Sequence, residues 1–133
     1  MVKQRIDTGG KVFGPYSPGV KANGIIWLAG QIAPEAGGIR EQTQASLDKI
    51  DALLAAAGVT KHEVTFAQVL LNDISDFTDM NEIYGAWLDG VEIPRHELLL
   101  RPPHCLVELQ SRLSSRHTMT SAVRNYAWFT IHR

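Results

Sequence analysis

Residues 14–32 read GPYSPGVKANGIIWLAGQI, two short extended segments on either side of an Asn-Gly pair at 23–24. Such a pair is typical of a type I′ β-hairpin, because both central residues of that turn need a positive φ angle. The second segment is β-branched and aromatic and stops at Ala29 and Gly30, where glycine allows a ligand or another backbone to approach closely. Two prolines stiffen the first segment, so Tyr16 can stand clear of the sheet. The stretch predicts a rigid hairpin and suggests a small-molecule site beside it.

The chain has 133 residues, of which 20% are charged, and a formal net charge of -1. This length suffices for one domain with a substantial core. The charge balance gives no electrostatic footprint for DNA or for an anionic membrane surface. The apolar runs of the first half are too short to span a membrane, and residues 1–5 do not lead into the apolar core of a secretory signal. A single cysteine, Cys105, suits a reducing compartment. We therefore expect a soluble, cytoplasmic, single-domain protein with no membrane partner.

Outward from the hairpin, residues 1–13 predict an irregular or edge-strand lead-in and residues 33–38 predict a loop. A helix is predicted over 41–57, because apolar residues recur on one face at steps of three and four. That face consists of Thr43, Leu47, Ile50, Leu54 and Ala57. Polar residues, Lys49 among them, fall on the other faces, and Gly58 stands where a left-handed C-terminal cap is expected.

Residues 64–71 form an almost continuous apolar run, which predicts an inner strand covered on both faces. A second helix follows, with Asp76 as its N-cap, Asp79 completing a carboxylate version of the capping box, and Gly90 at its end. The predicted buried stripe of this helix consists of Phe77, Met80, Tyr84 and Trp87.

Two further strands are predicted at 98–100 and 105–109, and the last twenty residues contain a strand-like stretch at 126–131. This tail could add a strand, pack on a neighbour or be disordered. The order of the elements predicts an α/β (α+β) fold, a mixed sheet with two helices on one face. The other face would be bare and apolar, which implies burial against another subunit.

Several motifs occur in a fixed order: GPYS at 14–17, NG at 23–24, AGQI at 29–32, AAAG at 55–58, FTDMNEIY at 77–84 and LVE at 106–108. With these motifs, residues 12–110 strongly resemble the Rid/YjgF family, the reactive-intermediate (imine/enamine) deaminases that are also catalogued as L-PSP endoribonucleases. The resemblance implies a chorismate-mutase-like fold and a homotrimeric barrel with three clefts between subunits. Residues 1–113 would form the Rid-like domain, and 114–133 a divergent tail of unknown role.

The resemblance implies hydrolysis of a small 2-imino acid to a 2-keto acid and ammonia, without a metal or cofactor. Arg95, in a Pro-x-Arg segment, would grip the substrate carboxylate, because a guanidinium matches a carboxylate bidentately. Glu108 would hold the attacking water, and Tyr16 would close the pocket and hydrogen-bond the substrate or the water. Ala29, Gly30, Gln31 and the backbone around Cys105 would complete the lining, with Arg101 as a second candidate for the carboxylate.

The chain departs from the family pattern at two places in this site. Ala29 stands where many members carry serine, and the interval from Arg95 to Glu108 is about two residues shorter than usual. An even shift keeps a side chain on the same face of a sheet, whereas an odd shift reverses it.

Each candidate also has a structural interpretation: Tyr16 as a packed edge residue, Arg95 as a solvated surface residue and Glu108 on the wet face of a sheet. The group His96, His104 and Cys105 matches no zinc spacing, and prolines interrupt its backbone. Two other functions are open. One is a non-catalytic trimeric ligand-binding or chaperone-like protein, and the other is a single-stranded RNA endoribonuclease. The absence of a basic aromatic stripe disfavours the second.

Overall fold

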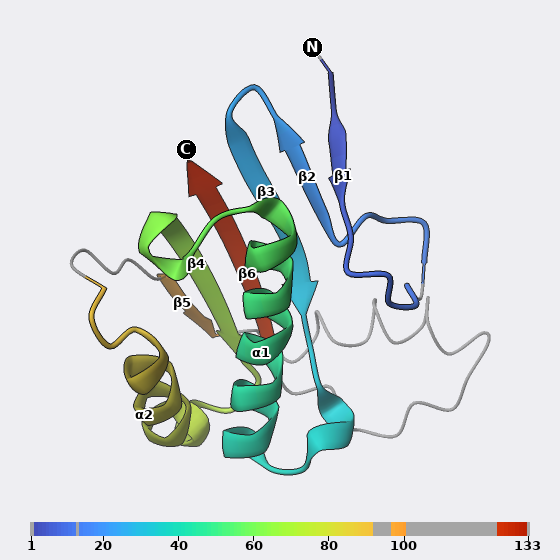
Figure 1. The fold of residues 1–133 in the computed structure, drawn as a ribbon. Helices are drawn as coiled ribbons and strands as arrows, with labels where there is room; N and C mark the ends of the chain where they lie inside the picture. The colour runs from blue at the N-terminus through green and yellow to red at the C-terminus, as the bar shows by residue number, and fades with distance from the viewer. Residues whose placement is uncertain (1, 13, 92–96, 101–124, 133) are drawn as a thin grey trace.

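A computed structural model of the chain describes residues 2–12, 14–91, 97–100 and 125–132, and it shows one mixed sheet with helices packed on one of its faces (Figure 1). The strand order is β1-β2-β3-β6-β4-β5, and β4 and β5 form the parallel pair. The described elements are β1 (Gln4–Ile6), β2 (Gly19–Ala22), β3 (Ile25–Gln31), α1 (Ile39–Ala57), β4 (Val64–Leu71), α2 (Phe77–Trp87), β5 (Glu97–Leu100) and β6 (Asn125–His132), with single 3-10 turns at Pro34–Ala36, Lys61–Glu63 and Ile74–Asp76. The predicted arrangement of a mixed sheet and two helices is confirmed.

The hairpin predicted around residues 23–24 joins β2 to β3. Asn23 has a φ angle of 54° and Gly24 one of 76°, so both central residues adopt the positive φ that the type I′ turn requires. Ile26 points into the core and is fully buried, whereas Trp27 points out and is 44% exposed. Strand β1 pairs with β2 at the edge of the sheet, which confirms the predicted edge strand.

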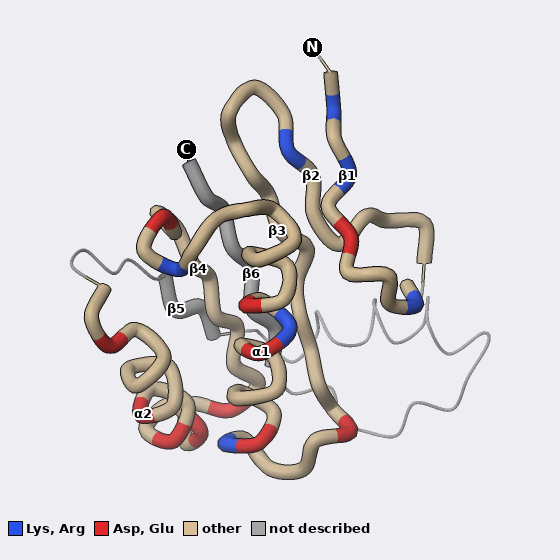
Figure 2. The backbone as a smooth tube through the Cα atoms, in the orientation of Figure 1, with Lys and Arg blue, Asp and Glu red and all other residues tan. Residues whose placement is uncertain are grey.

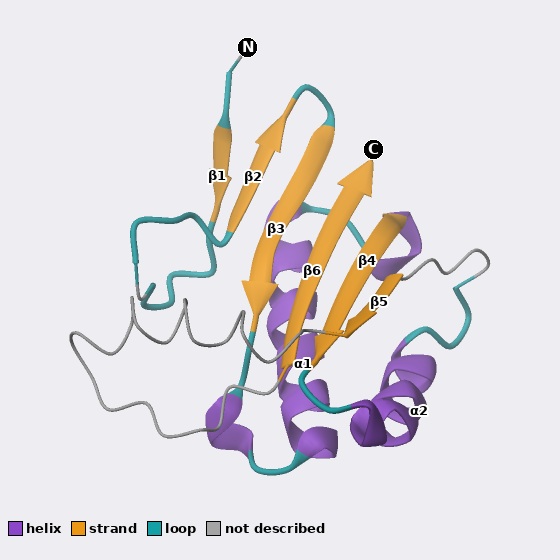
Figure 3. Cartoon of the chain, turned by 180° about the vertical axis from the view of Figure 1, so that it is seen from behind, coloured by secondary structure: helices purple, strands orange, loops and turns teal. Residues whose placement is uncertain are grey.

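Helix α1 begins two residues before the predicted start and ends where its sequence predicts. Gly58 adopts a left-handed conformation with φ 73°, and the Val59 N–H donates to the Leu54 carbonyl at 3.0 Å, as in a Schellman cap. The predicted apolar face is buried at Thr43, Leu47, Ile50 and Leu54. This face packs on the sheet, and Figure 3 shows α1 behind strands β3 and β6.

Asp76 stands at the N-cap position of α2, as predicted, but its side chain does not cap the helix. Asp76 has helical backbone angles, and its side chain makes no capping hydrogen bond. The Asp73 carboxylate instead accepts from the Ser75 N–H at 2.9 Å and caps the 3-10 turn that leads into α2. The capping side chain therefore lies three residues before the N-cap of α2, because the 3-10 turn has unpaired N–H groups of its own.

Asp79 does not complete a capping box either. Its carboxylate accepts from the Arg40 Nη1 at 2.9 Å, and the Glu82 carboxylate accepts from the same nitrogen at 2.7 Å, so the pair joins α2 to α1. The hydrogen bonds to these two carboxylates raise the pKa of Arg40, and the bond to Glu82 has the larger effect. Helix α2 ends at Trp87, before Gly90, which follows in a turn with φ 79°.

Strand β4 is an inner strand, as predicted, but only one of its faces is covered in the single chain. Val64, Ala67, Val69 and Leu71 are buried, whereas Thr65 is exposed and Phe66, Gln68 and Leu70 are half-buried. The prediction that both faces are covered is therefore wrong for the described chain, because both described helices pack on the same side of the sheet.

The C-terminal strand β6 lies between β3 and β4 and runs antiparallel to both. Of the three possibilities left open for the tail, the addition of a strand is what the structure shows over 125–132. The strand predicted at 98–100 is confirmed as β5. The strand predicted at 105–109 and the domain boundary at residue 113 lie outside the described residues.

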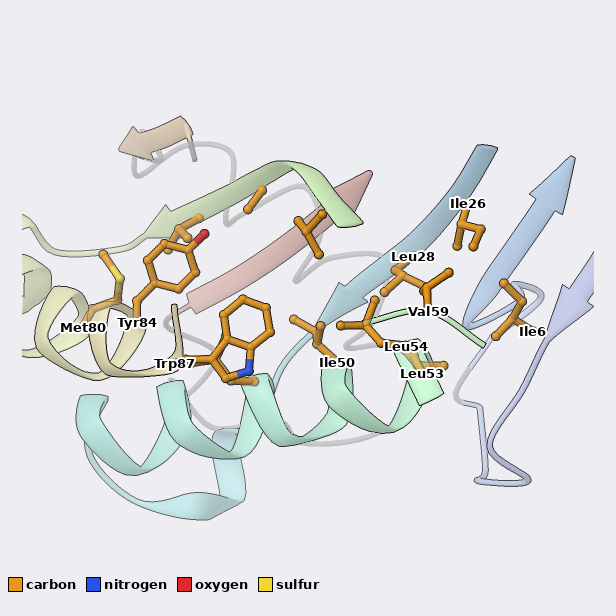
Figure 4. Packing of buried hydrophobic residues seen from close by; sticks show 14 of the residues in the cluster. Ile6, Ile26, Leu28, Ile50, Leu53, Leu54, Val59, Met80, Tyr84 and Trp87 are labelled. Carbon is orange, nitrogen blue, oxygen red and sulfur yellow. The ribbon is translucent and has the colours of Figure 1, made fainter. Parts of the chain in front are cut away.

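The core joins α2 to α1 through Trp87, one of the side chains drawn in Figure 4. The Trp87 ring lies 6.0 Å from that of Tyr84 in a stacked arrangement, and its Nε1 donates to the Asp51 Oδ1 at 2.9 Å. The Lys61 ammonium donates to the Trp87 carbonyl at 2.6 Å. Burial raises the pKa of Tyr84 to about 12. Three of the four residues of the predicted α2 stripe are buried, and Phe77 is half-buried at the core's edge.

Gly19 stands where β2 passes close to two core side chains. A Cβ at this position would lie 2.9 Å from the Leu28 Cδ2 and 3.1 Å from the Ile6 Cβ. We expect Gly19→Ala to lower the free energy of unfolding by roughly 1–3 kcal/mol, because the added methyl overpacks the core. Urea unfolding followed by circular dichroism measures the change.

The matched control is Gly85→Ala in the middle of α2, where an added Cβ would meet no atom within 4 Å. We expect this variant to be more stable by about 0.5–1 kcal/mol, since alanine favours the helix over glycine. Equal shifts of the two unfolding midpoints in the same direction would contradict the packing described for Gly19.

Candidate functional site

A pocket of about 260 Å³ lies at the C-terminal end of β3, between the N-terminal segment and α1. Its walls are formed by Thr8, Gly10, Lys11, Val12, Tyr16, Pro18, Gly30, Gln31, Ile32, Lys49, Ala52 and Leu53. Pockets for drug-sized ligands measure about 300–1,000 Å³, so this one suits a smaller molecule.

Tyr16 reaches the pocket from the stiff segment before β2. Its N–H donates to the Gly14 carbonyl at 2.9 Å, and the Pro18 carbonyl accepts from the Ala29 N–H at 2.8 Å. The second bond joins the segment directly to the end of β3. Tyr16 is 46% exposed, so its side chain stands at the pocket's rim and a bound molecule can reach it.

The end of β3 carries a bulge next to the pocket. Between Leu28 and Gln31 the register of β3 against β6 shifts by one residue, so that Ala29 and Gly30 face a single residue of β6. The Gln31 Nε2 donates to the Ala29 carbonyl at 3.0 Å across this bulge. Bulges occur often beside active sites, because the extra residue re-aims the strand and ends its regular pairing.

Lys49 fixes α1 to the loop that follows β3. Its Nζ donates to the Ile32 carbonyl at 2.6 Å and lies 3.4 Å from the Glu35 Oε1. The pKa of Glu35 is lowered, chiefly by its own backbone N–H and also by Lys49, so this carboxylate stays charged beside the ammonium. Lys49 and Ile32 both line the pocket, and their hydrogen bond sets the position of the ammonium at its wall.

Both charged side chains among the described residues that line the pocket are lysines, Lys11 and Lys49, and none of these residues is Asp or Glu. The whole chain carries a formal net charge of -1. Figure 2 shows acidic positions on α2, on α1 and at the end of β1. An anionic ligand would therefore find its opposite charge in this pocket rather than on the helical end of the molecule.

The structure brings together three of the residues that the sequence predicts for the site. Tyr16, Gly30 and Gln31 all line the pocket, although about fourteen positions separate the first from the other two. Ala29 lies beside them in the bulge but does not line the pocket. The other predicted site residues, Arg95, Arg101, Cys105 and Glu108, lie outside the described residues.

Sequence reasoning missed the two lysines of the pocket. The helical pattern of the sequence places Lys49 on a face other than the predicted apolar one. The spacing of Lys49, Ala52 and Leu53 at i, i+3 and i+4 was the available signal, because residues so spaced share one helix face. Lys11 belongs to an irregular segment, so no periodicity marks it.

The described part of the chain contains no group of three His, Cys, Asp or Glu side chains that could hold a metal ion. The group His96, His104 and Cys105 lies outside it. None of the described helices is both long and apolar enough to cross a membrane.

Comparison with known proteins places the chain among small relatives of similar length. A family model described as Endoribonuclease L-PSP matches residues 8–111. A RutC family protein of Pyrococcus horikoshii is 34% identical over 110 residues, which cover 76% of this chain and 87% of the relative. The protein mmf2 of Schizosaccharomyces pombe, which is named as mitochondrial, is 36% identical over 80 residues, or 56% of this chain and 64% of the relative.

Solved structures agree with these matches. A YjgF family protein of Neisseria meningitidis superposes with a TM-score of 0.75 and is 28% identical, covering 100% of this chain and 96% of that one. The E. coli protein TdcF, solved with bound serine, superposes with a TM-score of 0.75 at 21% identity and covers 98% of both chains. The motifs, the fold and the matched length lead to one conclusion: the chain belongs to the endoribonuclease L-PSP family, that of the Rid, YjgF and RutC proteins.

Proposed function

We propose that the protein hydrolyses small 2-imino acids, or their enamine tautomers, to 2-keto acids and ammonia. The observation that carries this proposal is the convergence of Tyr16, Gly30 and Gln31 on one pocket of about 260 Å³ with a positive lining. These residues belong to the motifs through which the chain resembles the imine deaminases. The relative TdcF was solved with bound serine, a small amino acid, which is consistent with a ligand of this size.

The reaction needs little from the protein beyond positioning. Water adds to the electrophilic carbon of the protonated imine, and the resulting carbinolamine expels its nitrogen as ammonia and leaves a carbonyl. Neither a metal nor a covalent nucleophile is required for this addition. A bound carboxylate, an oriented water and a polar group that accepts and returns a proton are sufficient.

Residue roles follow from the family resemblance. In this proposal Arg95 binds the substrate carboxylate, with Arg101 as the second candidate, and Glu108 orients the water. Tyr16 closes the pocket and hydrogen-bonds the substrate or the water, while Ala29, Gly30, Gln31 and the segment at Cys105 line it. The pocket formed by the described residues is then one wall of the site, and the arginine belongs to the other.

We also propose that three copies assemble with their bare sheet faces inward, in the chorismate-mutase-like barrel that the resemblance implies. Support comes from the face opposite the helices (Figure 3). This face carries the exposed Trp27 and the half-buried Val20, Ile25, Phe66 and Leu70. An apolar surface of this kind is more often found buried in an interface than open to water.

A coupled assay tests the deaminase proposal. Threonine dehydratase releases an unstable enamine and imine from threonine, and these hydrolyse slowly to 2-ketobutyrate in water. We expect the purified protein to accelerate the appearance of 2-ketobutyrate when the dehydratase is in excess. An equal mass of serum albumin is the control. An unchanged rate across a wide range of protein concentration would contradict the proposal.

The same preparation decides between the proposal and its alternatives. Binding of 2-ketobutyrate without any acceleration would favour the non-catalytic ligand-binding protein. Cleavage of single-stranded RNA that persists at about 200 mM salt would favour the endoribonuclease for which the family model is named, since phosphate contacts weaken with salt. The cytoplasm is the proposed compartment, because the single cysteine suits a reducing environment.

A further inference from the structure

The pocket holds more positive charge than a simple 2-imino acid needs. In the proposed function, the substrate carboxylate is bound by Arg95. Lys11 and Lys49 are additional cations that reach the pocket from the N-terminal segment and from α1. No Asp or Glu is among the described residues that line the pocket, although Glu35 beside it pairs with Lys49 at 3.4 Å.

Lys49 has a donor left for a ligand. An ammonium group offers three N–H donors. One of them is used by the Ile32 carbonyl at 2.6 Å, and a second is directed at Glu35, whose oxygen lies at the long distance of 3.4 Å. The Glu35 side chain is 70% exposed, so water screens its attraction for the lysine.

Lys11 is less constrained. Its segment is exposed, and its ammonium takes part in no hydrogen bond or ion pair with the described residues. An exposed lysine from the N-terminal segment and a hydrogen-bonded lysine from α1, which line the same pocket, can donate to the same anionic group. Each would contribute a charge-assisted hydrogen bond, which is stronger than a neutral one.

We propose that Lys11 and Lys49 bind a second acidic group of the substrate, so that the preferred substrates are 2-imino acids with a carboxylate in the side chain. This inference rests on the proposed function, because it assigns the first carboxylate to Arg95. Lys11 and Lys49 are specificity-determining residues in it and take no part in the chemical step. An enzyme that oxidises or eliminates from an acidic amino acid would supply such an imine.

Calorimetric binding of two stable product analogues to the full-length protein tests the inference. The probes are 2-oxoglutarate, a dicarboxylate, and 2-ketobutyrate, a monocarboxylate. We expect 2-oxoglutarate to bind at least about tenfold more tightly, the size of effect that one charged hydrogen bond gives. In Lys11→Gln and in Lys49→Gln, this affinity ratio should fall toward one.

Two variants make the result specific. Lys49→Arg retains a cation and should retain the ratio, and this variant also separates loss of charge from loss of the hydrogen bond to Ile32. Lys3→Gln, on the exposed start of the chain and away from the pocket, is the matched control and should bind both ligands as the natural protein does. Equal affinities in the natural protein, or an unchanged ratio in both glutamine variants, would overturn the inference.

The binding experiment does not depend on turnover, so its failure differs from failure of the proposed function. A protein that prefers 2-oxoglutarate but accelerates no imine hydrolysis contradicts the deaminase alone. A protein that accelerates hydrolysis but binds both ligands equally contradicts only the proposed binding of a second carboxylate by Lys11 and Lys49. Binding of neither ligand overturns the inference whatever the activity.

Discussion

Replacement of Trp27 by aspartate is expected to convert the proposed trimer into folded monomers. Trp27 points away from the helices and is 44% exposed in the single chain. It lies beside Val20 of β2, on the same face as Phe66 of β4. A tryptophan at the centre of an interface often contributes about 2 kcal/mol or more to binding, and a buried unpaired carboxylate adds a further penalty.

Light scattering coupled to gel filtration measures the change. The natural protein should have about three times the chain mass of 14.7 kDa, and Trp27→Asp should have the mass of a single chain. Its far-ultraviolet circular dichroism should stay the same, because the residue contributes little to the core of the single chain. Trp27→Phe, which keeps an apolar ring, is the control and should stay assembled. A natural protein that is monomeric, or an aspartate variant that is still assembled, would contradict the proposed trimer.

Arg95→Ala is expected to reduce kcat/KM for 2-iminobutanoate by about a hundredfold, which brings the assay to its uncatalysed background. A charged hydrogen bond contributes about 1.5–3 kcal/mol, and a bidentate arginine makes two such bonds while it also orients the reacting carbon. Arg95→Lys should restore only part of the rate, since a lysine provides a point charge without the planar fork.

Arg5→Ala is the matched control for this loss. Arg5 lies on the edge strand β1, its guanidinium pairs with Asp7, and neither residue lines the pocket. We expect this variant to hydrolyse 2-iminobutanoate at the rate of the natural protein. A reduced rate in Arg101→Ala together with a normal rate in Arg95→Ala would show that Arg101, and not Arg95, binds the substrate carboxylate. Normal rates in both would contradict an arginine-bound substrate.

The parts of the fold that could be predicted are those set by neighbouring residues. The turn at 23–24 needs only two residues that tolerate positive φ, and the end of α1 needs only a glycine after an apolar face. The start of α2 after Asp76 could be predicted, but the carboxylate that caps could not, because Asp73 and Asp76 are equivalent as sequence signals. Only the 3-10 turn between them determines which carboxylate meets a free N–H.

Long-range pairing explains the rest. Nothing in residues 125–132 specifies which strands they join, so the position of β6 between β3 and β4 could not be derived from local pattern. The wall of the pocket formed by Tyr16 and Gly30 could be predicted because both lie in recognisable motifs. Lys49 could not, since a lysine on a helix is usually solvated and its role here depends on where the loop after β3 passes.

The most direct test of the pocket as the ligand site is a titration of the protein with 2-ketobutyrate, followed in amide NMR spectra. The largest shifts should occur at Tyr16, Gly30 and Gln31, with smaller ones at the neighbouring turn of α1 around Lys49. Shifts confined to α2 or to the face around Trp27, or a spectrum that does not respond to the ligand, would contradict the assignment of the site to this pocket.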